Sequence, residues 1–205
     1  MGSSTDKPVI SRIAIAGAGG IGGFVAAGLY DYGVNRQQFE FSSMEIDVFD
    51  DDVVDVGNLL HQNFTEDDLG KMKADLLAER YAMNPIKRFM EVKDFPKYDL
   101  IFSCVDSMTF RKALYQWGWE NPGKAYWIDG RCNSRNIGVY NSKVSRKQLE
   151  SDLTDSTERR GCLRAIDKEK KVSHITPQVV ASMMLQLFLN YLRGEPTTDK
   201  ILVYI

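Results

Sequence analysis

The pattern of apolar and polar positions alternates between short β-rich runs and longer helical stretches. Residues 10–16 are apolar and β-rich, and an apolar helical stretch covers 24–32. A second strand is expected over 43–49. The run 98–105 is almost continuously apolar, as in a central parallel strand with both faces covered. Strands that alternate with helices at this spacing predict a doubly wound, mostly parallel α/β sheet of the Rossmann-like class.

The same periodicities predict the remaining elements. The spacing of Met72, Leu76, Leu77 and Tyr81 predicts a helix over 70–83 that ends at Asn84-Pro85. The other expected elements are an irregular stretch over 53–68, a short strand over 86–92, a helix over 108–118 capped by Asp106-Ser107, buried strands over 125–129 and 137–142, an apolar helix over 177–192 opened by Thr176-Pro177 and ended near Gly194, and a strand over 201–205.

These elements predict a single domain over residues 8–205. Its core is expected to cover 10–142, and the final helix and strand 176–205. The segment 143–172 between them is polar, charged and weakly patterned, so we expect a surface insertion or a mobile loop there. The C-terminal third is therefore the variable part of the domain.

Composition narrows the class of protein. A chain of 205 residues can bury one sizeable core, and its 43% apolar and 26% charged residues are close to the averages of globular proteins. A formal charge of −2 gives no general attraction to nucleic acid or to an anionic membrane. No apolar run approaches the roughly 20 residues that span a bilayer. Three cysteines without a CxxC pair fit a reducing compartment, so we expect a cytoplasmic protein.

A glycine-rich turn joins the first strand to the first helix, in the pattern Gly17-x-Gly19-Gly20-Ile21-Gly22. Glycines permit a tight turn and let backbone N–H groups and the helix N-terminus approach a phosphate. The alternative is a turn that serves packing alone. The position between a strand and a helix favours phosphate binding.

An acidic cluster, Asp50-Asp51-Asp52, ends the second predicted strand. A carboxylate there can accept hydrogen bonds from ribose hydroxyls, or contact a metal. Asp50 follows Gly22 by 28 residues, more than the roughly 20 of a simple dinucleotide fingerprint. A solvated acidic turn is the alternative for any one of the three.

Five motifs in order resemble the ThiF/MoeB/HesA superfamily, which includes the ubiquitin-activating enzymes. The glycine turn is the first. Asp50-Asp51-Asp52-Val53-(x4)-Asn58-Leu59-x-His61-Gln62 resembles D-x-D-x-V-x-x-S-N-L-x-R-Q. The other three are Leu69-Gly70-Lys71-Met72-Lys73-Ala74 for V-G-x-x-K-A, Asn84-Pro85 for N-P, and Ser103-Cys104-Val105-Asp106-Ser107-(x3)-Arg111 for A-x-D-N-x-x-x-R. The resemblance covers residues 10 to about 129.

The resemblance implies a site for ATP and Mg²⁺. It implies that Asp50 holds the ribose, that Asn58 and Lys73 contact the triphosphate, and that Asp106 coordinates Mg²⁺ or positions a substrate carboxylate. Gln62 joins Asn58, Lys73 and Asp106 in the expected catalytic set. The expected nucleotide-binding residues are Gly17, Gly19, Gly20, Ile21, Gly22, Asp50, Asp52, Asn58, His61, Lys73, Val105 and Asp106. The alternatives are a surface lysine at position 73 and a helix N-cap at Asp106.

Three departures from the family pattern bear on activity. His61 replaces an arginine whose charge persists at every physiological pH. Ser107 replaces an asparagine. The family's N-terminal helix, with an arginine that reaches a partner's site, has no clear counterpart, and Arg12 is too close to the first strand to serve.

The cysteines raise the question of thioester chemistry. Cys162 is flanked by Arg159, Arg160 and Arg164, which would lower the pKa of a thiol and attract an acyl-adenylate. The alternative is an incidental thiol on a basic loop. Cys104 is expected inside a strand. Packing is the expected role of Cys132, and the alternative is that it lines the site. The paired cysteines that bind zinc in many relatives are missing, so we expect no zinc.

Three functional hypotheses follow. The first is an ATP-dependent adenylyltransferase that activates the C-terminal carboxylate of a ubiquitin-like protein or peptide, working as a homodimer. The second is a non-catalytic member of the family that serves as a partner-binding or dimerisation module. The third, an NAD(P)-dependent oxidoreductase, rests on the glycine turn and the acidic strand end alone and predicts nothing at Asn58, Gln62, Lys73 or Asp106.

Overall fold

The strands of the computed structural model form one sheet in the order β3-β2-β1-β4-β5-β6-β7. The model describes residues 8–133, 136–152, 169–170 and 174–204. The strands are β1 (Arg12–Ala16), β2 (Glu45–Phe49), β3 (Asn84–Ile86), β4 (Leu100–Ser103), β5 (Tyr126–Asn133), β6 (Asn136–Asn141) and β7 (Lys200–Tyr204).

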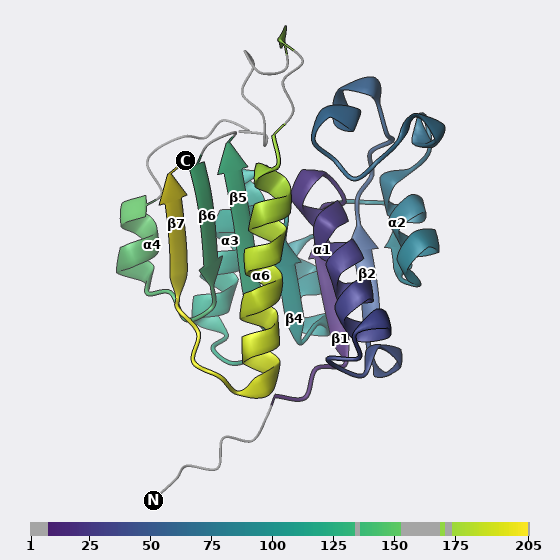
Figure 1. Cartoon of the computed structure of the whole chain (residues 1–205). Helices are drawn as coiled ribbons and strands as arrows, with labels where there is room; N and C mark the ends of the chain where they lie inside the picture. Colours follow the sequence, from purple (N-terminus) through teal and green to yellow (C-terminus); the bar gives the residue numbers. More distant parts are fainter. Residues whose placement is uncertain (1–7, 134–135, 153–168, 171–173, 205) are drawn as a thin grey trace, which may run out of the picture.

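The sheet is mostly parallel, as the sequence predicts. The strands β3, β2, β1, β4 and β5 are parallel neighbours. β6 is antiparallel to both β5 and β7, as its reversed arrow in Figure 1 shows. The carboxyl ends of the parallel strands therefore meet at one edge, where ligands of open α/β sheets bind.

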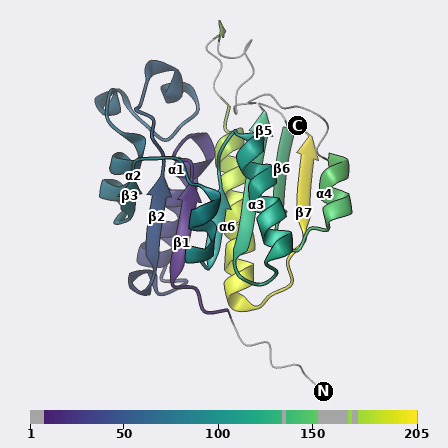
Figure 2. The same cartoon turned by 180° about the vertical axis from the view of Figure 1, so that it is seen from behind.

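Helices cover both faces of the sheet (Figures 1 and 2). The helices are α1 (Gly20–Tyr30), α2 (Lys73–Tyr81), α3 (Met108–Glu120), α4 (Arg146–Asp152) and α6 (Thr176–Arg193). Apolar side chains of α1, α2 and α6 share one buried cluster, and those of α3 and α4 share a second cluster on the opposite face. This confirms the doubly wound α/β fold in a single domain.

Short helical turns occupy several of the connections. They are a π-helical turn at Asp31–Asn35 and 3-10 turns at Phe41–Ser43, Val56–Leu60, Glu66–Asp68 and Val92–Lys97. The stretch predicted as irregular over 53–68 thus contains two of these turns. Figure 1 shows this stretch rising above the carboxyl edge of the sheet.

The helix α6 matches its prediction because both of its end signals work as expected. Pro177 lies in its first turn, and Gly194 ends it with a φ of 69°. α6 packs closely on α1 at Gly28, where a Cβ atom would lie 2.1 Å from Leu185 Cδ1. A side chain at position 28 would therefore push the two helices apart.

The predicted strand over 86–92 is wrong. The strand pairing with β2 is Asn84–Ile86, with Ile86 opposite Phe49. β3 lies at the edge of the sheet, where proline is tolerated within a strand. The preceding helix starts at Lys73 rather than at residue 70, and it ends because Ala82 adopts the left-handed conformation, with a φ of 52°.

The segment 143–172 differs in part from the expected polar insertion. Its first part contains α4, and the side chains of Val144 and Leu149 are buried. Two apolar residues in a charged stretch are too few to give a helical pattern, although they suffice to pack one short helix. Residues 153–168 and 171–173 lie outside the described ranges.

The length and apolar character of a helix decide whether it can cross a bilayer. Within the described ranges, no helix has the length and apolar character needed to cross a bilayer.

Candidate functional site

The glycine turn connects the carboxyl end of β1 to the start of α1. Gly17 has a φ of 93°, and its N–H donates a hydrogen bond to the Phe49 carbonyl oxygen at 2.8 Å. A Cβ atom at Gly22 would lie 1.8 Å from the Gly17 carbonyl oxygen. No side chain caps the N-terminus of α1, where Gly19 is the N-cap residue. The turn therefore requires glycine and leaves the helix N-terminus to bind an anion.

Asp50, at the end of β2, holds this turn from one side. Its carboxylate accepts hydrogen bonds from the backbone N–H groups of Ala18 at 2.7 Å and Asp52 at 2.9 Å. Burial raises the pKa of Asp50, although these two N–H groups and Lys73 act in the opposite direction. Contact of Asp50 with a ribose stays a prediction. What the structure adds is an anchoring contact between β2 and the turn.

Lys73, the first residue of α2, is buried and lies beside the acidic cluster. Its Nζ forms a 3.1 Å ion pair with Asp52, whose side chain is 62% exposed. The carboxylates of Asp50, Asp51 and Asp52 offer oxygens within 4.8 Å of one another. Because Lys73 is buried, the alternative of a surface lysine is wrong. A buried cation that is paired with an exposed acid can exchange that acid for a phosphate.

The 3-10 turn Val56–Leu60 brings Asn58 and Gln62 to the same edge. Asn58 and Asp55 form reciprocal 3.0 Å hydrogen bonds: the Asp55 N–H donates to the Asn58 amide oxygen, and the Asn58 N–H donates to the Asp55 carboxylate. The Gln62 side chain lies over the glycine turn, with Nε2 at 3.7 Å from where a Cβ of Gly19 would be. Among the described residues, no group donates to the buried Gln62 Oε1. His61 is the C-cap residue of the turn.

Val105 and Asp106 flank the glycine turn on the side of β4. A Cβ atom at Gly17 would lie 3.0 Å from the Cys104 carbonyl oxygen and 3.3 Å from Val105 Cγ1. The exposed Asp106 carboxylate has no hydrogen bond or ion pair with any described residue. Ser107 caps α3, since its side chain accepts from the Phe110 N–H at 3.3 Å. The N-cap alternative for Asp106 is therefore wrong, and its carboxylate is open to a ligand.

A buried cluster around Asp129, which the sequence did not reveal, adjoins this position. Asp129 Oδ1 accepts from Ser103 Oγ at 2.6 Å and from Arg111 Nε at 3.1 Å. Its Oδ2 accepts from Arg131 Nε at 2.7 Å and from the Tyr115 hydroxyl. Burial opposes ionisation, yet the two guanidinium groups and these hydrogen bonds hold the pKa of Asp129 below its ordinary value. The signal in the sequence was Arg111 and Tyr115, one helical turn apart.

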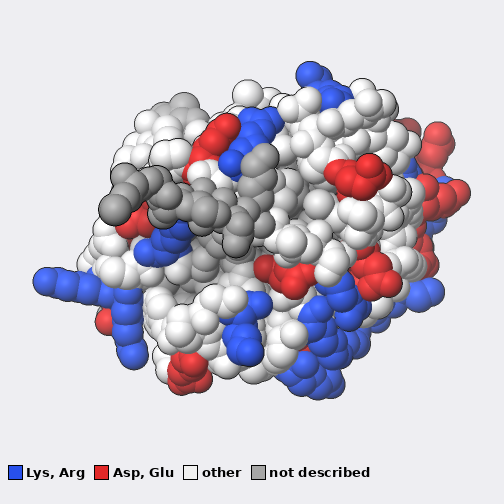
Figure 3. All heavy atoms as spheres, turned by 90° about the horizontal axis from the view of Figure 1, so that it is seen from below, with Lys and Arg blue, Asp and Glu red and all other residues white. Residues whose placement is uncertain are grey.

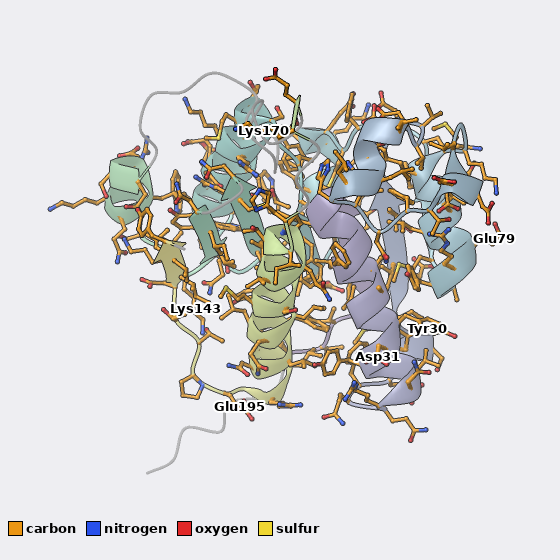
Figure 4. The ribbon with its side chains drawn as sticks, turned by 45° about the horizontal axis from the view of Figure 1, so that its top comes forward. Tyr30, Asp31, Glu79, Lys143, Lys170 and Glu195 are labelled. Atoms are coloured by element: carbon orange, nitrogen blue, oxygen red, sulfur yellow. The ribbon has the colours of Figure 1, made fainter. Side chains whose placement is uncertain are left out.

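Other candidate residues lie away from this edge or outside the described ranges. Arg12 begins β1 at the opposite edge and pairs with Glu45 at 3.0 Å. Figure 3 views the molecule from below and shows both acidic and basic side chains there, and Figure 4 shows Tyr30 and Asp31 at the end of α1 remote from its glycine start. Cys162 lies outside the described residues, and its thioester role stays a prediction.

The two described cysteines differ in burial. Cys132 is buried, in line with a packing role. Cys104 follows β4 rather than lying inside it, and it is half-buried. The strand ends at Ser103, two residues before the predicted end at 105.

The sheet order and the helices on both faces define an α/β domain of the Rossmann-like class. A family model for the ThiF family matches residues 4–204, so the chain belongs to the ThiF family. No curated protein matches it significantly in sequence.

Several solved structures share the fold. E. coli MccB with MccA-N7isoASN has a TM-score of 0.67 at 16% identity, over 95% of this chain and 61% of MccB. The microcin C7 biosynthetic enzyme MccB in complex with N-formylated MccA has a TM-score of 0.66 at 17% identity, over 95% of this chain and 62% of that one. PaaA has a TM-score of 0.63 at 14% identity, over 95% and 61%. The chain thus spans about three fifths of the length of these proteins.

Proposed function

We propose that this chain is an ATP-dependent adenylyltransferase that activates the C-terminal carboxylate of a peptide or ubiquitin-like protein. A carboxylate oxygen of the substrate attacks the α-phosphorus of ATP. The bond from that phosphorus to the bridging oxygen of the β-phosphate breaks, and pyrophosphate leaves with the electron pair. The products are an acyl-adenylate and pyrophosphate, and residues 8–205 act as one ThiF-like domain.

The observation that carries this proposal is the convergence of three chain segments on one glycine turn. Asp50 binds the Ala18 N–H from the side of β2, Gln62 covers Gly19, and Val105 contacts Gly17 from the side of β4. An NAD(P)-dependent oxidoreductase accounts for the turn but gives no role to Lys73 or Asp106. A site for a triphosphate gives each of them one.

The side chains at this edge fit a magnesium–nucleotide complex. The α1 N-terminus faces anions through backbone N–H groups, and Lys73 offers a cation for a phosphate oxygen. The Asn58 amide nitrogen forms no hydrogen bond with a described residue, so it can donate to a phosphate. Asp106 would hold Mg²⁺, which neutralises charge that develops on the departing pyrophosphate.

Two solved structures support the choice of substrates. MccB from E. coli was solved with ATP, at a TM-score of 0.62 and 16% identity to this chain. The complex of MccB with N-formylated MccA supports a peptide substrate. We also propose a homodimer in the cytoplasm, and light scattering of the purified protein tests the dimer directly.

Pyrophosphate exchange into ATP tests the activity. Peptides with a free C-terminal carboxylate should support exchange, and the same peptides with a C-terminal amide should not, because the amide lacks the attacking oxygen. Lys73→Met should weaken ATP binding about tenfold or more, since a hydrogen bond to a charged group contributes ~1.5–3 kcal/mol. Arg12→Lys, at the opposite edge, is the control that should bind ATP normally.

The outcomes separate the competing functions. ATP binding without carboxylate-dependent exchange, for any peptide or ubiquitin-like protein tried, would support the non-catalytic module. Tight NADH binding with no ATP binding would favour the oxidoreductase.

A further inference from the structure

The Arg111 side chain connects three backbone segments at the carboxyl edge. It is 6% exposed. Besides its contact with the Asp129 carboxylate, its Nη2 donates to the carbonyl oxygen of Gly130 at 3.2 Å and to that of Val105. One guanidinium therefore joins α3 to β5 and to the turn that follows β4.

The guanidinium itself is held firmly. Asp129 is fully buried and accepts four hydrogen bonds, about the full capacity of a carboxylate. Ser103 on the neighbouring strand β4 and Arg131 on β5 itself contribute two of these bonds. Arg111 therefore cannot change rotamer without leaving a buried carboxylate short of a partner.

The segment that Arg111 holds is the one that contacts the glycine turn. The Cys104 carbonyl oxygen and the Val105 side chain pack against Gly17, and Cys104 Cβ would lie 3.4 Å from a Cβ at Gly22. Asp106 comes next in the chain, between the Val105 carbonyl that Arg111 fixes and the Ser107 side chain that caps α3. The backbone of Asp106 is thus fixed on both sides, while its carboxylate stays exposed.

We propose that Arg111 is a positioning residue that sets the distance between the Asp106 carboxylate and the nucleotide at the glycine turn. Arg111 acts through the Val105 carbonyl and is itself oriented by Asp129. This inference rests on the proposed function, because it takes Asp106 as the ligand of the nucleotide's magnesium ion. Arg111→Lys keeps the charge beside Asp129, but lysine lacks the fork needed to reach three acceptors at once.

ATP affinity measured by calorimetry, once with Mg²⁺ and once with EDTA, tests the proposal on the full chain. In Arg111→Lys the gain in affinity from Mg²⁺ should fall about tenfold, as is typical when the support of a metal ligand is lost. Affinity in EDTA should stay within about twofold of wild type, because the glycine turn and Lys73 are untouched. Asp106→Asn should lose the same gain, and the double variant should lose no more than either single variant.

Controls separate positioning from a general loss of structure. If Arg111→Lys folds poorly, Ser103→Ala takes its place. It removes one donor to Asp129 and should also reduce the gain in ATP affinity from Mg²⁺. Arg12→Lys should leave it unchanged. Three results with Arg111→Lys would each overturn the proposal. They are ATP binding like that of wild type, an equal loss of affinity with and without Mg²⁺, and a loss that adds to that of Asp106→Asn. A wild type that binds ATP with no gain from Mg²⁺ also overturns it, whereas a wild type that binds no ATP refutes the proposed function itself.

Discussion

Asp129 and Asp106 lie at the same edge of the sheet, on β5 and just after β4, but their surroundings differ. Asp129 is fully buried, and protein donors occupy both of its oxygens. Asp106 is exposed and has no hydrogen bond or ion pair within the described part of the chain. A buried charge needs partners because desolvation costs several kcal/mol, whereas an exposed one does not. The closed region around Asp129 serves the fold, and the open region around Asp106 leaves its side chains for a ligand.

Removing the central carboxylate of the closed region should have the largest effect. Asp129→Ala leaves Arg111 and Arg131 without their shared counter-ion, and breaking a buried ion pair costs about 3–5 kcal/mol. Urea unfolding, followed by circular dichroism, measures this change in the free energy of unfolding.

The matched control for that variant comes from the open region. Asp106→Ala removes an exposed acid that has no hydrogen bond or ion pair with a described residue, so it should cost less than about 1 kcal/mol. Equal losses in the two variants would show that the two regions do not differ as the contacts indicate.

The glycine turn, which packs against Cys104 and Val105 beside the open region, should come next in size. Gly22→Ala places a Cβ atom 1.8 Å from the Gly17 carbonyl oxygen, so the turn must shift, at a cost of about 1–3 kcal/mol. At Gly19 the nearest atom would lie at 3.7 Å, so Gly19→Ala should change stability by about 0.5 kcal/mol or less. Thermal unfolding of the two variants compares them, and a Gly22→Ala protein as stable as Gly19→Ala would contradict the tight turn.

The sequence predicts the open region better than the closed one, for a physical reason. The resemblance to the family motifs singles out Lys73 and Asp106, and hydrophobic periodicity places them, like Gly17, near strand and helix ends. The Asp129 cluster joins side chains from three elements, and only the helical spacing of Arg111 and Tyr115 hints at a shared face. The contact between Asp50 and the Ala18 N–H is also long-range, between residues 32 positions apart. Periodicity describes one element at a time, so contacts between elements escape it.

Titration should also distinguish two buried carboxylates that differ in their partners. Asp94 is a second closed carboxylate: Arg88 binds it at 2.7 and 2.9 Å and, with Lys97, holds its pKa well below the ordinary value of 3.8. Such a group stabilises the fold above pH 3.8 and loses that contribution as the pH falls towards its folded pKa. Asp50 has the opposite sign, since burial raises its pKa and the folded state holds its proton more tightly.

Asp94→Asn should therefore flatten the acid limb of stability. Below pH 4 the slope of the unfolding free energy against pH should fall by at most about 1.4 kcal/mol per pH unit, which corresponds to the uptake of one proton. Urea unfolding at several pH values between about 2 and 7 measures this slope. An unchanged slope would mean that the ion pair with Arg88 does not lower the pKa of Asp94.

A further small effect is expected within the open region, at the turn that carries Asn58. Asp55→Ala removes the acceptor of the 3.0 Å hydrogen bond from the Asn58 N–H, and loss of such a cap costs about 1 kcal/mol. In this variant the Asn58 side chain can still accept from the backbone N–H at position 55. ATP affinity should therefore fall less than in Asn58→Ala, which removes the amide nitrogen that we propose donates to a phosphate. Calorimetry of both variants tests this order. An Asp55→Ala protein that loses as much ATP affinity as Asn58→Ala would show that Asp55 contributes to the nucleotide site directly, so that the open region is larger than the side chains around Asp106 and Lys73.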